Sequence, residues 1–252
     1  MFSIYAFHTK LASSTTAATA LTPVTDSIAT VSSPYLYVPA LNNLIGGYLI
    51  GQGADQAYIQ TPTLLNIANY RVAPIDTGAA DPGSPLPIRL RPASPVKLTQ
   101  NEGMQFFSDN ANASNQYDTT GIVFLADGAL APVTGDIRTV KCTVTTSATG
   151  FSWINEALTF VDNLPAGSYN LVGMRVEGAH VLAARVVFQG SASVRPGCIG
   201  TGSATKLDAE VFRNGNLGVW GSFTAFNPPS LDIMTDGTSE TAVVFLDIIK
   251  TQ

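Results

Sequence analysis

The stretch NLPAGSYNLVGMRVEGAHVLAARVVFQGSASVRPGC, residues 163–198, contains two apolar strand-like segments separated by a Glu-Gly-Ala turn and closed by a Pro-Gly break. In the first segment Val172, Met174 and Val176 alternate with residues of the other face, which is typical of a β-strand with one face more buried than the other. The earlier stretch GGYLIGQGADQAYIQTPTLLNIANYRVAPID, residues 46–76, follows the same plan. The two stretches raise the question of whether one β-domain was built twice.

Further matches between the two halves favour a duplication. A gapless alignment of 48–74 with 170–196 pairs Leu49 with Leu171. Two later matches follow in the same order, TTGIVFLAD (119–127) with ETAVVFLDI (240–248) and MQFFSD (104–109) with LDIMTD (231–236). The late matched strands predict one buried phenylalanine in each core, Phe124 and Phe245.

The second strand of the repeat does not fit this alignment. Leu65 and Ile67 carry the apolar face of the first copy, whereas Val186 and Phe188 carry it in the second. A one-residue slip moves every side chain of a strand to the other face, so the gapless register conflicts with the pattern here. An insertion of one residue, which pairs Leu65 with Phe188, would remove the conflict.

The composition indicates an all-β protein and argues against several classes of function. Of the 252 residues, 45% are hydrophobic and only 12% are charged, with 22 Gly and 15 Pro. The formal net charge is −5 and basic residues form no run, so we expect no direct binding of nucleic acid. Apolar segments such as residues 121–133 end well short of the roughly 20 residues of a membrane-spanning helix.

The domain organisation follows from these patterns. Residues 1–34, rich in Ser, Thr and Ala after the first ten positions, are expected to form an N-terminal arm. Residues 35–135 and 136–252 are then the first and the second β-barrel. The spacing of Trp153, Ala157 and Phe160 predicts one short helix within 151–165. The alternative to two domains is a single large β-sandwich.

The sequence contains no strong catalytic or metal-binding motif. The glycines of 51–56 and 197–206 lack the full nucleotide-binding patterns and are better explained as turn residues. Cys142 and Cys198 do not constitute a disulfide framework, and we expect Cys142 to be a buried thiol. The two histidines, His8 and His180, are expected to be structural or solvated. We therefore expect no enzymatic activity and no cofactor.

The most polar stretch, SDNANASNQYD (108–118), leaves two interpretations open. Asp109, Asn110 and Asp118 are oxygen-bearing residues of the kind that ligate calcium. The segment departs from the EF-hand pattern, and a plain surface loop is the favoured interpretation.

The duplicated β-unit, with its strand–turn–strand segment YNLVGMRVEGAHVLAARVVFQG and an uncharged N-terminal arm, resembles the double jelly-roll major capsid proteins of tailless icosahedral viruses that contain a membrane, the corticovirus and tectivirus type. The resemblance spans about residues 35–250 and concerns pattern and order. It implies two tandem eight-stranded antiparallel barrels and trimers that act as pseudo-hexameric capsomers. The chain would be a coat protein of the virion, with no catalytic activity.

The same resemblance implies the partners. They would be two further copies of the chain, the neighbouring capsomers of the shell, and other capsid proteins such as a vertex protein. The arm would contact a neighbouring subunit or an internal membrane, with Phe2, Tyr5 and Phe7 as assembly anchors. The alternative from another class is a carbohydrate-binding or receptor-binding β-sandwich, in which aromatic residues such as Trp220 or Tyr117 stack on sugars.

Overall fold

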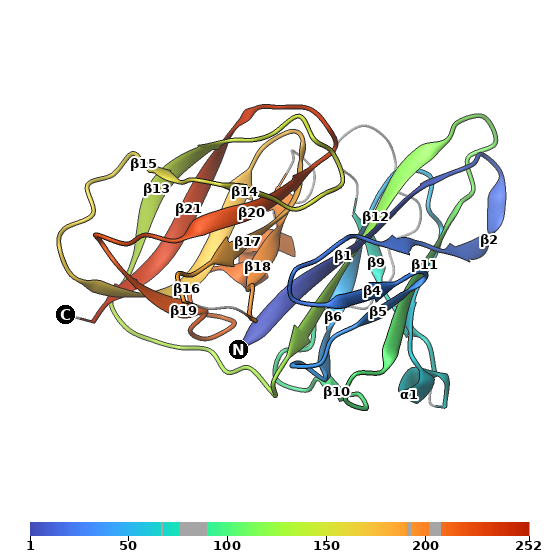
Figure 1. The fold of residues 1–252 in the computed structure, drawn as a ribbon, viewed down its shortest axis with the longest axis horizontal. Helices are drawn as coiled ribbons and strands as arrows, with labels where there is room; N and C mark the ends of the chain where they lie inside the picture. Colours follow the sequence, from blue (N-terminus) through green and yellow to red (C-terminus); the bar gives the residue numbers. More distant parts are fainter. Residues whose placement is uncertain (67, 76–89, 191–192, 202–207, 252) are drawn as a thin grey trace. The chain divides into compact units, whose positions relative to one another are not determined.

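A computed structural model describes residues 1–66, 68–75, 90–190, 193–201 and 208–251 (Figure 1). Almost all regular structure in this part of the chain is β-strand, and the only helices described are the one-turn α1 (Pro62–Leu65) and the 3-10 turn η1 (Asp208–Phe212). The all-β class expected from the sequence is confirmed. The chain forms two compact units: unit 1 comprises Met1–Ile4 and Leu130–Gln252, and unit 2 comprises Tyr5–Ala129.

Unit 2 contains two sheets whose inner faces enclose one core. The first sheet has the order β10 (Val96–Lys97), β6 (Asn43–Ile50), β12 (Tyr117–Ala126), β1 (Phe2–Leu11) and β3 (Thr22–Pro23), with β9 (Ala73–Ile75) also beside β6. The second has the order β4 (Thr30–Ser32), β5 (Tyr35–Tyr37), β11 (Gly103–Asn110), β7 (Ala57–Gln60) and β8 (Tyr70–Arg71), with β2 (Thr15–Ala20) also beside β11.

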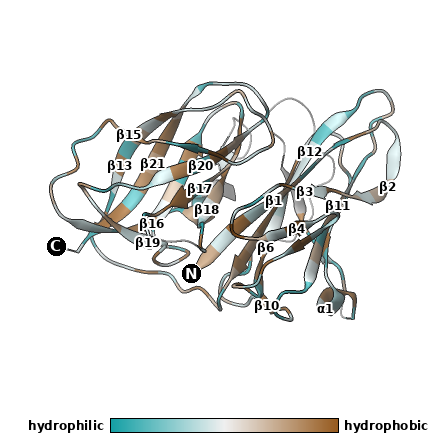
Figure 2. Ribbon diagram, in the orientation of Figure 1, coloured by the Kyte–Doolittle hydropathy of each residue, from teal (hydrophilic) through white to brown (hydrophobic). Residues whose placement is uncertain are grey.

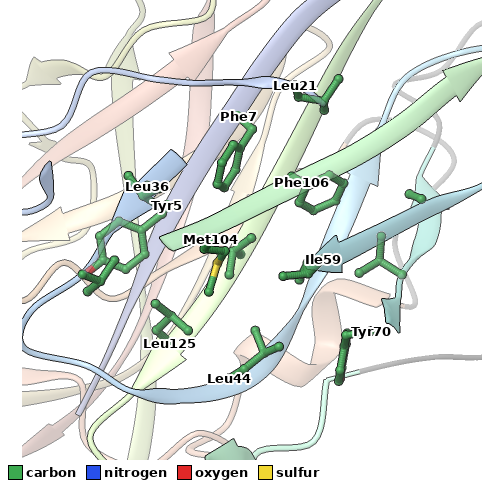
Figure 3. Packing of buried hydrophobic residues seen from close by; sticks show 14 of the residues in the cluster. Tyr5, Phe7, Leu21, Leu36, Leu44, Ile59, Tyr70, Met104, Phe106 and Leu125 are labelled. Carbon is green, nitrogen blue, oxygen red and sulfur yellow. The ribbon is translucent and has the colours of Figure 1, made fainter. Parts of the chain in front are cut away.

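Side chains from both sheets meet in the core of unit 2 (Figure 3). Phe7 of β1 and Phe106 of β11 lie with their ring centroids 5.9 Å apart. Leu125 of β12 and Met104 of β11 belong to the same cluster of buried residues. Burial of such side chains is worth about 1.5–3 kcal/mol each, which makes this cluster the main stabilising feature of the unit.

Unit 1 is built on one continuous sheet. Its order is β14 (Ile154–Glu156), β20 (Ser230–Thr235), β17 (Val181–Val187), β18 (Gly197–Thr201), β16 (Ser168–Glu177), β21 (Thr241–Lys250), β13 (Ile137–Thr145) and β15 (Thr159–Phe160), with β19 (Gly221–Thr224) also beside β16. A short parallel pairing of β16 with β18 joins its two halves. In Figure 2 the hydrophobic colour follows strands such as β17 and β6, in agreement with the burial of their side chains.

The principal strands of the two units follow the same order. In chain order they are β1, β5, β6, β7, β8, β10, β11 and β12 in unit 2, and β13, β14, β16, β17, β18, β19, β20 and β21 in unit 1. In each unit the first strand neighbours the eighth, the eighth the third, and the third the sixth. The second neighbours the seventh, the seventh the fourth, and the fourth the fifth. This is the order of an eight-stranded jelly roll.

The matched sequence segments occupy corresponding strands. Residues 104–109 and 231–236 form most of β11 and β20, the seventh strand of each unit, and 119–127 and 240–248 include most of β12 and β21, the eighth. The two stretches quoted first contain the fourth strand of each unit and all or part of the third and fifth strands. The similarity found in the sequence is therefore a similarity of strand order.

The gapless register, however, is wrong. Leu49 lies opposite Gly121, in the middle of β12, whereas Leu171 lies opposite Ile248, near the end of β21. Leu65 lies in the helix α1 and not in a strand. Thr61 is the N-cap of this helix and Pro62 is its first residue. The Leu65 side chain is 60% exposed. The conflict in side-chain parity disappears because the true fourth strand, β7, ends before this helix.

Three other expectations are corrected by the structure. Residues 151–165 form the strands β14 and β15 and no helix, because Ile154 and Glu156 extend the sheet by pairing with Ile233 and Leu231 of β20. Residues 1–34 do not form a separate arm. Within them lie β1, β2, β3 and β4, all of which belong to sheets. The two units divide at Ala129/Leu130, whereas the sequence analysis placed the boundary at 135/136.

Candidate interaction surfaces

The three aromatic residues proposed as assembly anchors are buried inside this chain. Phe2 is 1% exposed, and Tyr5 and Phe7 are both 0% exposed. The Phe2 ring meets Trp220 edge to face, with centroids 5.2 Å apart. The proposal that these rings reach a neighbouring subunit or a lipid is therefore wrong. The sequence signal was present, because the apolar and β-branched run of residues 2–7 is typical of a buried strand.

The first four residues are fixed within unit 1 by backbone hydrogen bonds. The Ile4 N–H donates to the Arg195 carbonyl at 3.1 Å, and the Arg195 N–H donates to Ser3 Oγ at 2.8 Å. The Arg185 guanidinium donates to the Ile4 carbonyl at 3.4 Å. These contacts make residues 1–4 part of the fold of unit 1, while Tyr5 onward belongs to unit 2.

Unit 1 contains two ion pairs that are largely shielded from solvent. Asp247 of β21 is 0% exposed and receives Arg213 Nε at 2.6 Å and Nη2 at 2.9 Å. The Asn214 N–H and the Thr139 hydroxyl donate to the same carboxylate at 2.9 and 2.7 Å. Burial raises the pKa of Asp247, but these four donated bonds outweigh it, and the net effect lowers the pKa below its ordinary value of 3.8.

The second buried pair joins neighbouring strands. Arg185 of β17 donates to Asp232 of β20 at 2.9 Å, and its guanidinium lies 4.3 Å from the ring centroid of Trp153. Asn155 of β14 also donates to Asp232, at 2.9 Å. Both pairs hold strands and loops together, and a removed partner would leave a charge buried without compensation. We interpret them as structural sites.

Equivalent aspartates close the same loop in both units. Asp109 at the end of the seventh strand of unit 2 accepts the backbone N–H groups of Asp55 and Gln56 at 2.9 and 3.1 Å. Asp236, just after the seventh strand of unit 1, contacts His180 Nδ1 at 2.8 Å. In each case the carboxylate holds the connection between the third and fourth strands.

The two histidines have separate structural surroundings. His8 Nε2 lies 3.4 Å from Asp118, and burial lowers the pKa of His8 despite that neighbour. The hydrogen bond to Asp236 raises the pKa of His180. The Thr120 hydroxyl lies 3.2 Å from His8 Nδ1. Each histidine therefore has a carboxylate partner from its own unit.

The candidate calcium ligands serve three different purposes. Asp109 holds the loop described above, Asp118 faces His8, and Asn110 Nδ2 donates to the carbonyls of Leu11, Ala12 and Asn115. Among the described residues, no group of three or more His, Cys, Asp or Glu side chains could hold a metal ion. Asp109 and Asn110 are buried residues at the end of β11, and Asp118 lies at the start of β12, so only residues 111–116 form the expected loop.

The structure also describes the two cysteines and much of the glycine-rich segments. Cys142 and Cys198 are free and buried, and burial raises the pKa of each thiol to about 12. Gly51 and Gly53 lie in the turn between β6 and β7, and Gly53 has a φ of +72°, as expected of turn glycines. Residues 202–206 of the second glycine-rich segment lie outside the described residues.

The aromatic residues named for sugar stacking do not form an exposed platform. Trp220 is 1% exposed, so its assignment as a sugar-binding residue is wrong. Tyr117 is half-buried, and its hydroxyl accepts a bond from Asn115. Among the described residues, the most exposed large apolar side chain is Phe226, at 87%. In the described chain, no helix is long and apolar enough to cross a membrane.

Unit 1 has a groove beside β13. It has a volume of about 460 Å³. Val140, Tyr169 and Ile248 contribute apolar surface, and residues 162–165 form part of its lining. Charged groups from Arg138, Lys250 and two aspartates also line it. It lies next to a strand edge, which makes it a candidate surface for a protein partner.

Comparisons with known proteins add little to these observations. No known protein family matches the sequence, and no curated protein matches it. Among solved structures, the chain is similar to the major capsid protein P2 from bacteriophage PM2, with 9% identity over 100% of this chain and 98% of that chain. The TM-score is 0.25. A similarity at this level supports no conclusion about function. The function proposed for the chain rests on its strand order alone.

Proposed function

We propose that the chain is a structural coat subunit of a virion, and that three copies form a pseudo-hexameric capsomer. The observation that carries the proposal is the repetition of one jelly-roll strand order in two units of a single chain. Three such chains present six similar modules around a threefold axis, and copies of a symmetric building block can then tile a closed shell.

The polar sites of the protein agree with a role that depends on rigidity. The carboxylates of Asp247, which is buried, and of Asp232, which is half-buried, hold strands and loops together, and the thiols are buried. With a net charge of −5, the chain offers no general attraction to nucleic acid. We propose accordingly that it acts without catalysis, and that its partners are further copies of itself and other shell proteins.

The test is the state of the purified protein at increasing concentration. A trimer of three 26.4 kDa chains has a mass of about 79 kDa, which static light scattering measures directly. Electron microscopy of the concentrated protein should then show shells or hexagonal plates. A monomer at all micromolar concentrations, with dispersed small particles on the grid, would refute the proposal.

A further inference from the structure

One edge of strand β13 is only partly covered. Along its other side β13 pairs with β21 from Ile137 to Thr145. On the partly covered side β15 pairs only with Cys142 and Thr143. The Val161 and Asp162 N–H groups donate to the Lys141 carbonyl, and the Lys141 N–H donates to Asp162 Oδ2 at 2.6 Å. Beyond Lys141 the covering segment leaves the strand.

The uncovered part of this edge carries backbone groups without a partner strand. Backbone N–H and C=O groups of successive strand residues point to opposite sides, so Thr139 and Ile137 point the same way as Lys141. The Ile137 N–H bonds to the Gly135 carbonyl. Within the described chain, no strand pairs with the Thr139 N–H, the Thr139 C=O or the Ile137 C=O on this side. An open row of this kind is a template for another strand.

The groove of about 460 Å³ lies along this same edge. Thr139 and Val140 line one side, and Leu164 and Pro165 also contribute to it. A residue placed opposite Thr139 would project its side chain to the Thr139 face of the sheet. Its two neighbours would project to the other face, which carries Val140 and Ile248. The groove therefore suits an extended chain whose alternate residues are apolar.

The charges around the groove specify the partner further. Arg138 donates to Asp136 at 2.9 and 3.1 Å, and Asp162 is engaged by the Lys141 N–H. Lys250 also lines the groove, and no carboxylate of the described chain forms an ion pair with it. The cation of Lys250 is therefore the charged group of the groove that is open to a partner, and it is complementary to an acidic residue.

From these observations we propose that the edge of β13 at Ile137–Thr139 accepts an extended peptide segment of another polypeptide as an added β-strand. The segment places an apolar side chain over Val140 and Ile248 and a carboxylate beside Lys250. Recognition by strand addition draws affinity from main-chain hydrogen bonds and specificity from the pocket for alternate side chains. The inference goes beyond the role as a coat subunit and does not depend on shell formation.

The test uses a blocked heptapeptide in which Thr alternates with Val and the last two residues are Asp. Titration calorimetry should give a dissociation constant of about 1 mM or tighter with the full chain. Hydrogen exchange at the Thr139 amide should slow in the complex. The same peptide with N-methyl groups on alternate residues should bind at least roughly tenfold more weakly, because it cannot complete the ladder.

Two substitutions at one position separate the backbone from the side chain. Thr139→Pro removes the edge N–H, and proline is tolerated where that group faces away from the sheet. Thr139→Val keeps the N–H but also loses the hydroxyl that donates to Asp247. We expect Thr139→Val to bind like the parent chain and Thr139→Pro to bind at least roughly tenfold more weakly. Lys250→Gln should weaken binding of the acidic peptide, but not binding of the same peptide with Asn in place of Asp.

The outcomes are decisive in both directions. Absence of binding at millimolar peptide, or equal binding by Thr139→Pro and Thr139→Val, would overturn the proposal. Unchanged exchange at the Thr139 amide in a saturated complex would do the same. If Thr139→Pro does not fold, the comparison of the plain and N-methylated peptides on the parent chain still decides.

Discussion

Removal of the Asp247 carboxylate should destabilise unit 1 far more than removal of an exposed carboxylate in the same sheet. Asp247 accepts four hydrogen bonds, two of them from Arg213, and is fully buried. Asp247→Ala would leave that guanidinium and the Asn214 N–H without their acceptor. Breaking a buried ion pair costs about 3–5 kcal/mol. For a chain of this size that corresponds to a fall in Tm of roughly 6–20 °C.

The chain contains a matched control residue, Asp136, and two tryptophans that report on unit 1. Asp136 pairs with Arg138 in a similar geometry, but both side chains are more than three-quarters exposed, so Asp136→Ala should change the stability little. Both tryptophans, Trp153 and Trp220, belong to unit 1, so tryptophan fluorescence during denaturation follows that unit. Equal losses of stability in the two variants would refute the reasoning.

Low pH should also weaken the stabilising contribution of Asp247. Because the pKa of Asp247 is lowered in the folded chain, its stabilising contribution is present above its ordinary value of 3.8. That contribution is lost as the pH falls through the lowered folded value. The double variant Arg213→Met/Asp247→Leu replaces the pair with apolar groups and should lose less stability than Asp247→Ala alone. Its stability should also change less below pH 4, in a comparison of denaturant midpoints across pH.

Three further predictions follow from burial and local charge. Phe7→Ala should destabilise the fold by about 3–5 kcal/mol in calorimetric unfolding, since the ring is fully buried against Phe106, and a loss below about 1 kcal/mol would contradict its place in the core. Cys142 and Cys198, with pKa values raised to about 12, should not react with a thiol reagent at pH 8 until denaturant is added, and prompt labelling of the native chain would contradict this. In an NMR titration His180 should titrate above 6.5 and His8 below it, and a shared midpoint would contradict the described surroundings.

The sequence predicted the class and the strand correspondence because both depend on local patterns. Alternation and β-branched residues identify strands one by one, and three ordered matches were enough to relate the seventh and eighth strands of the two units. The gapless register failed because loops and bulges change length independently of strand order. The β6–β12 ladder shifts between Phe124 and Leu125, and the β16–β21 ladder shifts between Leu171 and Gly173.

The N-terminal error has a different physical origin. The Ser, Thr and Ala residues of 11–34 favour a loose segment, but residues 2–7 do not share that composition. These residues are buried because they belong to strand β1, and their burial depends on partners far along the chain: Arg195, 191 residues from Ile4, and Phe106, 99 residues from Phe7. Composition reports on a segment alone, whereas burial depends on what the rest of the chain places against it.

The phenylalanines of the eighth strands test the duplication at the level of single side chains. Val123 and Leu125 face the core of unit 2, so Phe124 lies on the other face of β12, where Tyr48 meets it edge to face at 5.8 Å. Val244 and Leu246 are likewise buried in β21, so Phe245 takes the corresponding position on its outer face. The parity agrees in the two units, but the expectation that both rings are core residues is wrong: Phe124 is 0% exposed, whereas Phe245 is half-buried.

Truncation of the two rings should therefore differ although the positions correspond. Phe124→Ala should cost about 3–5 kcal/mol, as for a fully buried aromatic ring. Phe245→Ala should cost about 1–2 kcal/mol, since a half-buried ring removes less apolar area from water. Calorimetry measures the loss of stability of Phe124→Ala. Tryptophan fluorescence during denaturation measures that of Phe245→Ala, because Phe245 lies in unit 1 with both tryptophans. A larger loss for Phe245→Ala would mean that the outer face of β21 is covered more completely than that of β12. The equivalence of the eighth strands would then extend to their order in the sheet but not to the environment of their side chains.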